Sequence, residues 1–518
     1  MDRHATSREP GWQTAPAGCA ASAPHASAAG LLFINPPAPE GETWIRCQHR
    51  AAQRAPDGMV WPQVALAQLA ALFPERPVHI IDANARRWAW ADVEAELKRL
   101  RPRWYVTQVA GPILEQDLRG LALAKSVGAV TVAFGPLVSP VAYELLRRFP
   151  QLDYVVCGEP EVTLRQLVDA ADRCGDERPP SIHALCQAAS AEPRPKTLAA
   201  VRGLAWRREG EIVLNPRQGL IPRLDDLPLP AHHLLPLGSY CGPATEAPAA
   251  VVVTGRGCPG ECCFCLKHIT YRQEVRVRSP QSILEELLLL RRLGVRHVYM
   301  QADLFTICRE QVRDLCRLMI AEGLGLAWSC STRPDAVDEE LLQCMAAAGC
   351  RRITWALESG SEALLWRIGK RTRVAAAEQA VRWARAAGIS NWASFILGLP
   401  GETEDTIRQT VNLAKRLSLE RVTFELAVPR PGTPFWEQAA AKRWLRWGMR
   451  WHQGDAAGPA MVDYPWLSAE RLELALERAY RDWALRPGSA WGQLQRLSRS
   501  QPRPGWDWGT HRLSLAAS

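Results

Sequence analysis

The stretch Thr254-Gly-Arg-Gly-Cys258-Pro-Gly-Glu-Cys262-Cys-Phe-Cys265 decides how the rest of the sequence is interpreted. It places three cysteines, Cys258, Cys262 and Cys265, in the spacing C-x3-C-x2-C. The apolar run at 249–253 that precedes it is typical of a buried strand, so the cysteines belong to the loop after that strand. Parallel α/β sheets carry their chemistry on loops at the carboxyl ends of strands. The stretch therefore predicts a chemical site in an α/β domain.

Three thiolates at this spacing are suited to holding three irons of a 4Fe-4S cluster, because thiolates are the usual ligands of such clusters. The fourth iron would have no protein ligand and would stay open to an exogenous one. Gly255, Gly257 and Gly260 allow the backbone to fold tightly and to direct N–H groups toward the cluster sulfurs.

Two other interpretations of the cysteines stay open at the level of the sequence. One is a zinc site, for which His268 would supply the fourth ligand, because zinc usually takes four Cys or His ligands. The other is that the cysteines lie close together by chance. Cys263 interrupts the spacing, so we interpret it as a spare thiol and not as a ligand.

Composition limits the class of partner. A chain of 518 residues, 47% of them hydrophobic, predicts two or three domains with sizeable cores. The net charge is +9, and the 63 basic residues are spread along the chain without a basic tail or an aromatic-basic stripe. This pattern argues against nucleic acid as a partner.

The distribution of apolar residues and cysteines predicts a cytoplasmic protein. Residues 1–30 are rich in Ala, Ser and Pro and lack the apolar core of a signal peptide. The sequence has no run of 18 apolar residues, so we expect no transmembrane span. Fifteen scattered cysteines fit a reducing compartment in which most thiols stay free.

The first half of the sequence alternates between short apolar runs and helical patterns. The runs predict strands at 31–34, 78–81, 104–109, 130–134 and 154–157, with helices between them. This alternation predicts a doubly wound, parallel-sheet (Rossmann-like) domain, which binds ligands at the carboxyl edge of its strands. The candidate residues at that edge are Asn35, Pro36, Thr107, Gly135, Gly158 and Glu159.

The second half alternates again. Strands are predicted at 249–254, 297–300, 326–330, 352–357, 392–397 and 421–428, with helices between them. Six such units predict a partial (β/α)6 barrel that opens at the carboxyl ends of its strands. The fold class is therefore α/β, with a small helical C-terminal part that contains a helix at 468–484. We expect a disordered tail at 1–28, the doubly wound domain at 29–190, a linker with a hairpin at 191–243, the barrel at 244–440 and a C-terminal helical extension at 441–518.

With Phe264 as its aromatic residue, the cysteine stretch reads C-x3-C-x-Φ-C and resembles the signature of radical S-adenosylmethionine enzymes. The flanking stretches, over roughly residues 30–490, resemble the cobalamin-binding subgroup, which includes the anaerobic Mg-protoporphyrin ester cyclase and radical C-methylases. The resemblance implies three cofactors, namely a 4Fe-4S cluster, S-adenosylmethionine and cobalamin. The cobalamin would lie on the carboxyl edge of the first domain.

The first domain departs from many cobalamin domains, because it lacks the Asp-x-His-x-x-Gly stretch whose histidine binds cobalt. His49 lies in the loop after the first strand and is a candidate ligand, although a solvent-facing loop histidine is the simpler interpretation. We therefore expect cobalamin to bind without a histidine ligand. A flavodoxin-like domain that binds another nucleotide, or nothing, is the alternative.

In the family, loops at the strand ends hold S-adenosylmethionine, and the resemblance assigns residues to this role. Asp303 follows the second barrel strand, where the family usually has Gly-Gly-Glu, and would accept a hydrogen bond from the ammonium group. Ser329 and Arg333 follow the third strand and would bind the carboxylate, for which a guanidinium suits bidentate contact.

Two further matches lie at the fourth and fifth strands. Glu358 and Ser359 belong to a Leu-Glu-Ser-Gly stretch that resembles the family's Glu-Ser-Gly, which places Glu358 at the ribose hydroxyls. Gly398 begins Gly-Leu-Pro-Gly-Glu, which resembles the signature that lines the adenine. The plain alternative is that acidic residues such as Asp303 and Glu358 are helix caps or surface charges.

The resemblance implies an enzyme that methylates an unactivated carbon of a small molecule, such as a tetrapyrrole, a lipid or a natural product. An electron donor such as ferredoxin or flavodoxin would serve as its protein partner. Oxidative cyclisation or hydroxylation of a tetrapyrrole by the same radical chemistry is an alternative. A non-catalytic sensor built on cobalamin and the cluster is an alternative of another class. The sequence identifies no catalytic residue.

Overall fold

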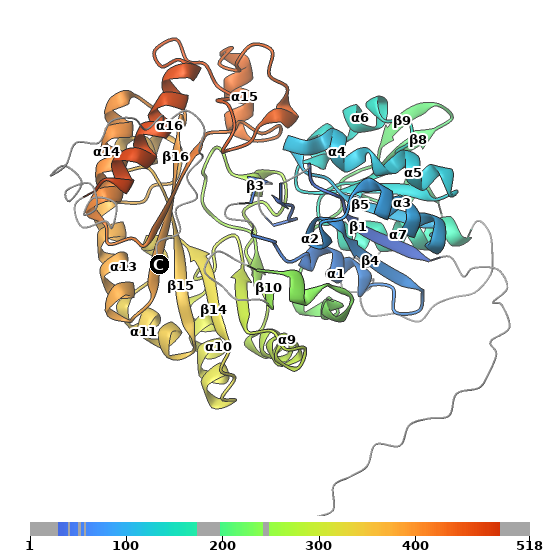
Figure 1. The fold of residues 1–518 in the computed structure, drawn as a ribbon, viewed down its shortest axis with the longest axis horizontal. Helices are drawn as coiled ribbons and strands as arrows, with labels where there is room; N and C mark the ends of the chain where they lie inside the picture. The colour runs from blue at the N-terminus through green and yellow to red at the C-terminus, as the bar shows by residue number, and fades with distance from the viewer. Residues whose placement is uncertain are drawn as a thin grey trace, which may run out of the picture.

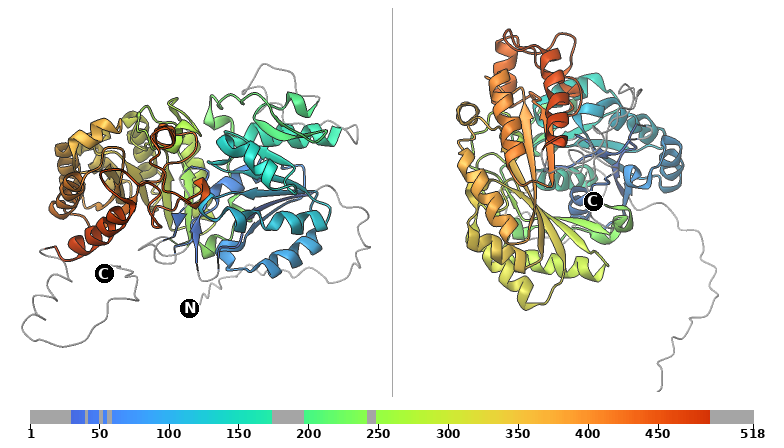
Figure 2. Two further views of the ribbon diagram at one scale, coloured as in Figure 1. Left: turned by 90° about the horizontal axis from the view of Figure 1, so that it is seen from above. Right: turned by 60° about the vertical axis from the view of Figure 1, so that its left-hand side comes forward.

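The computed structural model describes residues 30–39, 42–49, 53–55, 59–173, 197–241 and 248–486. The tail predicted at 1–28 lies outside these ranges, as does the end of the C-terminal extension. Two sheets with their helices lie side by side, and the chain passes from the first to the second in the middle of the sequence (Figures 1 and 2). The predicted α/β class with two successive sheets is confirmed.

The first sheet has seven strands in the order β4-β1-β5-β6-β7-β8-β9. The bounds are β1 Leu31–Asn35, β4 Val78–Asp82, β5 Trp104–Gln108, β6 Val130–Phe134, β7 Tyr154–Val156, β8 Leu204–Arg208 and β9 Glu211–Leu214. The five strands from β4 to β7 are parallel, as predicted. The hairpin β8–β9, which we expected in the linker, pairs antiparallel with β7 and extends the sheet.

Helices cover both faces of this sheet. They are α1 Val64–Ala70, α2 Ala83–Arg86, α3 Trp90–Leu100, α4 Leu114–Leu118, α5 Gly120–Ser126, α6 Val138–Arg148 and α7 Pro160–Arg173. Leu31 and Phe33 of β1 pack with α1 and α7 in one core, while Leu32 and Ile34 pack with α3, α5 and α6 in another. Successive strand residues point to opposite faces, so apolar residues at every position of β1 produce a sheet buried on both sides.

The second sheet has six parallel strands in chain order, β10-β13-β14-β15-β16-β17. The bounds are β10 Ala249–Val253, β13 His297–Gln301, β14 Ala327–Thr332, β15 Cys350–Glu358, β16 Ser390–Leu397 and β17 Arg421–Leu426. Between them run α9 Pro280–Arg292, α10 Arg309–Ala321, α11 Glu339–Ala347, α12 Glu362–Arg367, α13 Val374–Ala386 and α14 Glu404–Arg416. The predicted (β/α)6 arrangement is confirmed.

The core of the barrel lies between the sheet and its outer helices. Val298 and Met300 of β13 are buried in this core, so the alternating residue Tyr299 faces the inner side of the curved sheet. There the Tyr299 hydroxyl donates a hydrogen bond of 2.7 Å to the Ser331 hydroxyl of β14. The inner side therefore carries polar groups, whereas the outer side is apolar.

The C-terminal part adds α15 Pro434–Ala441 and α16 Ala469–Ala484 (Figure 1). The predicted helix at 468–484 is confirmed, and Ser468 caps it by accepting a hydrogen bond from the backbone N–H of Arg471. The Tyr480 hydroxyl bonds to the backbone of Phe424, which fastens α16 to β17. Within the described ranges, no helix has the length and apolar character needed to cross a membrane.

Candidate active site

The three cysteines lie on one loop between two short strands. These are β11 Gly255–Arg256 and β12 Arg276–Val277, which form an antiparallel ladder, and the residues between them, 257–275, are called the cysteine loop below. The loop begins directly after β11, next to the carboxyl end of β10, where the sequence predicts it. Gly257 has φ +88°, and a Cβ there would lie 1.9 Å from the Glu274 carbonyl oxygen, so only glycine fits this close crossing.

Two of the thiols surround Gly260. The sulfurs of Cys258 and Cys262 lie 3.5 and 3.9 Å from the point that a Cβ on Gly260 would occupy. Burial, assisted by the neighbouring Asp303 and the other two thiols, raises the pKa of Cys265 to about 12, and burial also raises the pKa of Cys262. Thiols in such a place ionise only when a bound metal supplies positive charge, so the donor set fits a metal group.

The geometry distinguishes between kinds of metal group. In the described part of the chain, no three His, Cys, Asp or Glu side chains are arranged to hold a single metal ion. A ring nitrogen of His268 lies 3.0 Å from the Cys262 carbonyl oxygen, so this side chain bonds to the backbone of the loop. Cys263 packs with Phe264 against the barrel core. The loop therefore fits a wide cluster with three thiolate ligands better than a zinc ion with His268 as its fourth ligand.

Asp303 follows β13 and lies against the cysteine loop. Its carboxylate accepts a hydrogen bond of 2.7 Å from the backbone N–H of Gly257. Burial raises the pKa of Asp303 to about 6, although this hydrogen bond and the positive charge of Arg256 oppose the shift. The structure thus brings Asp303 to the predicted place, and its role toward a ligand remains a prediction.

Arg333 also reaches the cysteine loop. Its Nη1 lies 3.3 Å from the point that a Cβ on Gly260 would occupy. The same guanidinium pairs with Asp335 at 2.9 and 2.6 Å and donates to the Lys370 carbonyl and the Thr372 hydroxyl. Arg333 is therefore held rigidly beside the loop, with part of its charge balanced by Asp335.

Ser329 does not lie at the site. The strand β14 continues to Thr332, two residues past the end that the sequence predicts, so Ser329 lies inside the strand. Its hydroxyl is 2.9 Å from a ring nitrogen of His297, the first residue of β13. This contact belongs to the amino end of the barrel, so the expectation that Ser329 binds a carboxylate at the opposite end is corrected.

Glu358 ends β15 in an unusual backbone conformation. It has φ +64° without being glycine, next to a register shift in the pairing of β15 with β16. Its Oε1 accepts a hydrogen bond of 3.0 Å from Lys370 Nζ, and both side chains are buried. Such strain costs about 1–3 kcal/mol and is concentrated at functional sites. Cys262 lies within the electrostatic range of both Glu358 and Lys370, so this ion pair belongs to the same site.

Ser359, the next residue, turns away from the site. Its hydroxyl lies 3.1 Å from the Thr410 hydroxyl on α14 and accepts a hydrogen bond from the Ser361 N–H. The expected contact of Ser359 with a cofactor is therefore corrected to a contact between the strand end and a helix.

Gly398 begins the loop after β16. It has φ +88°, its N–H donates to Glu402 Oε2 at 3.1 Å, and its carbonyl accepts a hydrogen bond of 2.8 Å from the Tyr464 hydroxyl. Burial raises the pKa of Glu402 to about 7. The loop is thus fixed from both sides at the carboxyl edge of the barrel, and its predicted contact with adenine stays a prediction.

At the carboxyl edge of the first sheet, several candidates serve the fold. Asn35 donates a hydrogen bond of 2.7 Å to Asp82 and accepts one of 3.2 Å from Arg46, so its amide is occupied internally. Pro36 and Thr107 are buried behind this edge. These contacts correct the expectation that Asn35 faces a ligand.

The two glycines of the edge differ from each other. A Cβ on Gly135 would lie 2.6 Å from the Val109 carbonyl oxygen, so backbone packs too closely against this glycine for any side chain to fit. Gly158 has φ +80°, and a Cβ there would meet nothing within 4 Å. Its carbonyl accepts a hydrogen bond from the side chain of Gln48, whose Oε1 is buried without a partner among the described residues. Of these two glycines, Gly158 is therefore the one with open space beside it, and we refer to this place as the open edge of the first sheet.

The contacts of two residues of the first domain, His49 and Glu159, differ from those that the sequence predicts. His49 is half-buried and packs against the cysteine loop, because its Nδ1 lies 2.7 Å from the Tyr271 hydroxyl and the two rings stack. Burial, reinforced by Arg256, lowers the pKa of His49, so its ring is neutral. Glu159 does not face a ligand either, because it is paired with Arg256 and Arg276.

Sequence reasoning missed several side chains of the site. Lys370, which pairs with Glu358, follows α12 in a stretch without a motif. Lys267 is buried and donates a hydrogen bond of 3.1 Å to the Cys258 carbonyl. Its nearness to Cys265 in the sequence was the only available signal, and a lysine in a loop normally indicates a solvent-exposed position.

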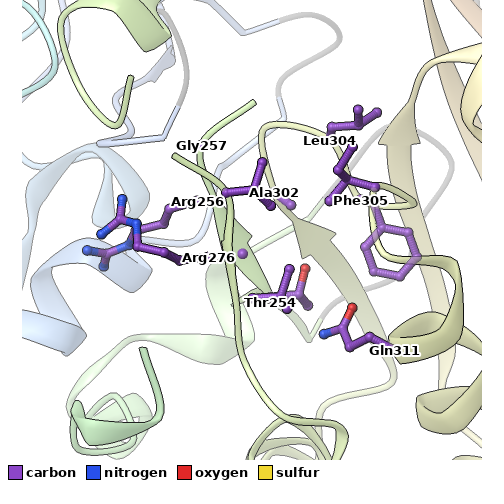
Figure 3. Close-up of a pocket in the computed structure, with 12 residues that line it drawn as sticks. Thr254, Arg256, Gly257, Arg276, Ala302, Leu304, Phe305 and Gln311 are labelled. Carbon is purple, nitrogen blue, oxygen red and sulfur yellow. The ribbon is translucent and has the colours of Figure 1, made fainter. Parts of the chain in front are cut away.

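A pocket lies behind the ladder of β11 and β12 (Figure 3). It is a narrow, partly open crevice without room for a water molecule, and it is lined by Thr254, Ala302, Leu304, Phe305 and Gln311 among others. Its lining includes Gly257 and Val275, the two ends of the cysteine loop, but neither the three cysteines nor Glu358, so it lies behind the loop and not at the thiols. Arg256 and Arg276 extend side by side away from it, toward the first domain (Figure 3).

Comparison with known proteins agrees with this site. Residues 252–414, which include the cysteine loop, match the family model of the radical SAM superfamily. The chain is 29% identical over 434 residues to an uncharacterised methyltransferase of Pyrococcus horikoshii, covering 83% of this chain and 89% of that protein. It is 27% identical to the anaerobic magnesium-protoporphyrin IX monomethyl ester cyclase of Cereibacter sphaeroides, covering 73% of this chain and 60% of the cyclase.

A solved structure shares the fold of both domains. It is the radical S-adenosylmethionine methyltransferase TsrM of Kitasatospora setae, with cobalamin and a 4Fe-4S cluster bound, at TM-score 0.59 and 19% identity. The match covers 80% of this chain and 75% of TsrM. The resemblance to radical S-adenosylmethionine enzymes that the sequence indicates is therefore confirmed.

Proposed function

We propose that the chain is a cobalamin-dependent radical S-adenosylmethionine enzyme that methylates an unactivated carbon of a small molecule. The observation that carries this proposal is the cysteine loop at the carboxyl edge of a six-stranded parallel sheet, inside a matched radical SAM domain. The methyltransferase name of the Pyrococcus relative and the cobalamin and cluster in the TsrM structure support the choice of reaction and cofactors.

In this proposal, Cys258, Cys262 and Cys265 hold the cluster. When bound, the cluster supplies an electron that cleaves S-adenosylmethionine, and cobalamin supplies a carrier for the methyl group. Glu358 binds the ribose hydroxyls, and Lys370 orients the Glu358 carboxylate through their buried ion pair. Asp303 and Arg333 lie against the same loop and contact the ammonium and carboxylate groups.

The first domain contributes the cobalamin site at its carboxyl edge, near Gly158. The substrate is a tetrapyrrole, a lipid or a natural product, and the electron donor is a small redox protein such as ferredoxin or flavodoxin.

A second candidate reaction is oxidative cyclisation of a tetrapyrrole, which the similarity to the Cereibacter cyclase favours. The chain spans only 60% of that enzyme, so the methyltransferase, matched over 89% of its length, supports the first proposal more strongly.

The test is product analysis of the reconstituted protein, reduced with dithionite and supplied with S-adenosylmethionine. A methylase forms S-adenosylhomocysteine together with 5′-deoxyadenosine, whereas a cyclase forms 5′-deoxyadenosine without S-adenosylhomocysteine. A protein that carries both cofactors and forms neither product would contradict the enzymatic proposal and favour a sensor.

A further inference from the structure

Two buried arginines lie on the two strands that enclose the cysteine loop. In the ladder of β11 and β12, Arg256 is directly opposite Arg276. They are 4% and 5% exposed, and both extend toward the first domain (Figure 3). Like charges directly opposite each other destabilise a strand pair, so this arrangement requires counter-charges.

The counter-charges come from the other domain. Glu159 accepts hydrogen bonds from Arg256 Nη1 at 3.0 Å and from Arg276 Nη1 at 2.9 Å. Glu161 accepts one from Arg256 Nη2 at 2.5 Å. We call Glu159, Glu161, Arg256 and Arg276 the interdomain network, and it balances two positive charges with two negative ones. Glu159 directly follows Gly158, so the network joins the open edge of the first sheet to both ends of the cysteine loop.

Two further segments of the chain contact the interdomain network. Ile221, in the segment that connects the two domains, donates its N–H to Glu159 at 2.7 Å and accepts from Arg276 at 2.8 Å. The Arg256 guanidinium also lies 5.2 Å from the ring centre of Tyr271, which bonds to His49 of the first domain. The cysteine loop is therefore fixed to the first domain through three separate segments.

Stability alone does not account for this arrangement. A buried ion pair is often no more stabilising than apolar packing of the same volume. Within the described ranges, Glu161 Oε2, Arg276 Nη2 and Arg256 Nε are also buried without a hydrogen-bond partner. Features that break a stability rule are expected where function requires a particular geometry.

We propose that the interdomain network is a positioning device that fixes the distance and orientation of the cysteine loop relative to the open edge near Gly158. The inference rests on the proposed function, in which that loop holds the cluster and that edge holds cobalamin. The two cofactors would act on one substrate, which a radical from one S-adenosylmethionine activates and which receives the methyl group of a second, so their separation must be fixed for the two halves of the reaction to be coupled.

The test is the distance between the two cofactors in the full chain. Wild type, Glu159→Gln and Asp169→Asn are loaded with the cluster and cobalamin and reduced to cob(II)alamin and the paramagnetic cluster. Pulsed EPR then measures the distribution of distances between the two spins. Asp169 is a matched control, because its carboxylate is also buried and pairs with Arg165, but within α7.

Wild type and Asp169→Asn should give one narrow distribution. Glu159→Gln should give a roughly twofold broader one, since an unsupported site loosens by about 1 Å. Equal widths in the three proteins overturn the positioning role. Failure of wild type to hold both cofactors contradicts the proposed function instead. If Glu159→Gln loses a cofactor, Arg276→Lys is measured in its place. If both Glu159→Gln and Arg276→Lys lose a cofactor while Asp169→Asn retains both, the network is needed for binding, and a role limited to positioning is overturned.

Discussion

Replacement of Glu358 by glutamine tests the S-adenosylmethionine site through two separate quantities. The carboxylate would accept charge-assisted hydrogen bonds from the ribose, each worth about 1.5–3 kcal/mol. Loss of the charge should therefore weaken S-adenosylmethionine binding about 10- to 100-fold, because about 1.4 kcal/mol corresponds to tenfold. The same change leaves the buried Lys370 ammonium, now 3.0 Å from the carboxylate, without its counter-charge. Removal of one partner of a buried pair costs up to about 3–5 kcal/mol, so the free energy of unfolding should fall as well.

The assay is titration of S-adenosylmethionine into the reduced protein, followed by the EPR signal of the cluster, with thermal unfolding measured on the same samples. Glu286→Gln is the control, because Glu286 is a buried carboxylate of the same domain that pairs with Arg278 and His232. The control should lose stability but keep its affinity. If Glu358→Gln binds S-adenosylmethionine as tightly as wild type, Glu358 does not contact the ribose and serves only as the partner of Lys370.

Three further outcomes follow from the same structure. Cys258→Ala should lose the 4Fe-4S absorbance and Cys263→Ala should keep most of it, whereas loss of the cluster in the second variant would refute the assignment of ligands. Burial raises the pKa of Glu402 from 4.5 to about 7, so the folded protein binds this proton more tightly than the unfolded chain does. This proton contributes up to about 3 kcal/mol to the free energy of unfolding. The contribution is fully present below pH 4.5 and is lost as the pH rises through 7. The unfolding midpoint should therefore fall less between pH 5 and pH 8 in Glu402→Gln than in wild type, and equal falls would show that Glu402 ionises normally. Gly158→Leu should lose hydroxocobalamin on desalting, while Gly128→Leu, at a similarly open glycine of positive φ before β6, should retain it; equal retention would place cobalamin elsewhere.

The sequence predicts the strands and helices well because their signals are local. Each barrel strand is an apolar run or an alternating pattern that ends at a turn, and these patterns depend only on burial. The cysteine spacing is also local, and Cys258, Cys262 and Cys265 lie within eight residues of one another. Two parallel sheets in succession follow from the same alternation.

The sequence does not reveal which side chains pair with each other when they are far apart along the chain. His49 and Tyr271 are 222 residues apart, and Glu159 and Arg256 are 97 apart, so no periodicity connects them. Glu159 follows the end of a strand, where ligand-binding residues are often found. Its position in the sequence does not show whether its carboxylate binds a ligand or pairs with an arginine of the other domain. Ser359 illustrates the same limit, because its partner Thr410 lies on a later helix.

The proposed reaction depends above all on three thiolates that leave one iron of the cluster open for S-adenosylmethionine. Electron-nuclear double resonance on the reduced cluster, with S-adenosylmethionine labelled with 15N at its amino group, tests this claim directly. We expect a 15N coupling in wild type, because the amino nitrogen would bind the open iron. An intact cluster with bound S-adenosylmethionine but no 15N coupling would contradict it.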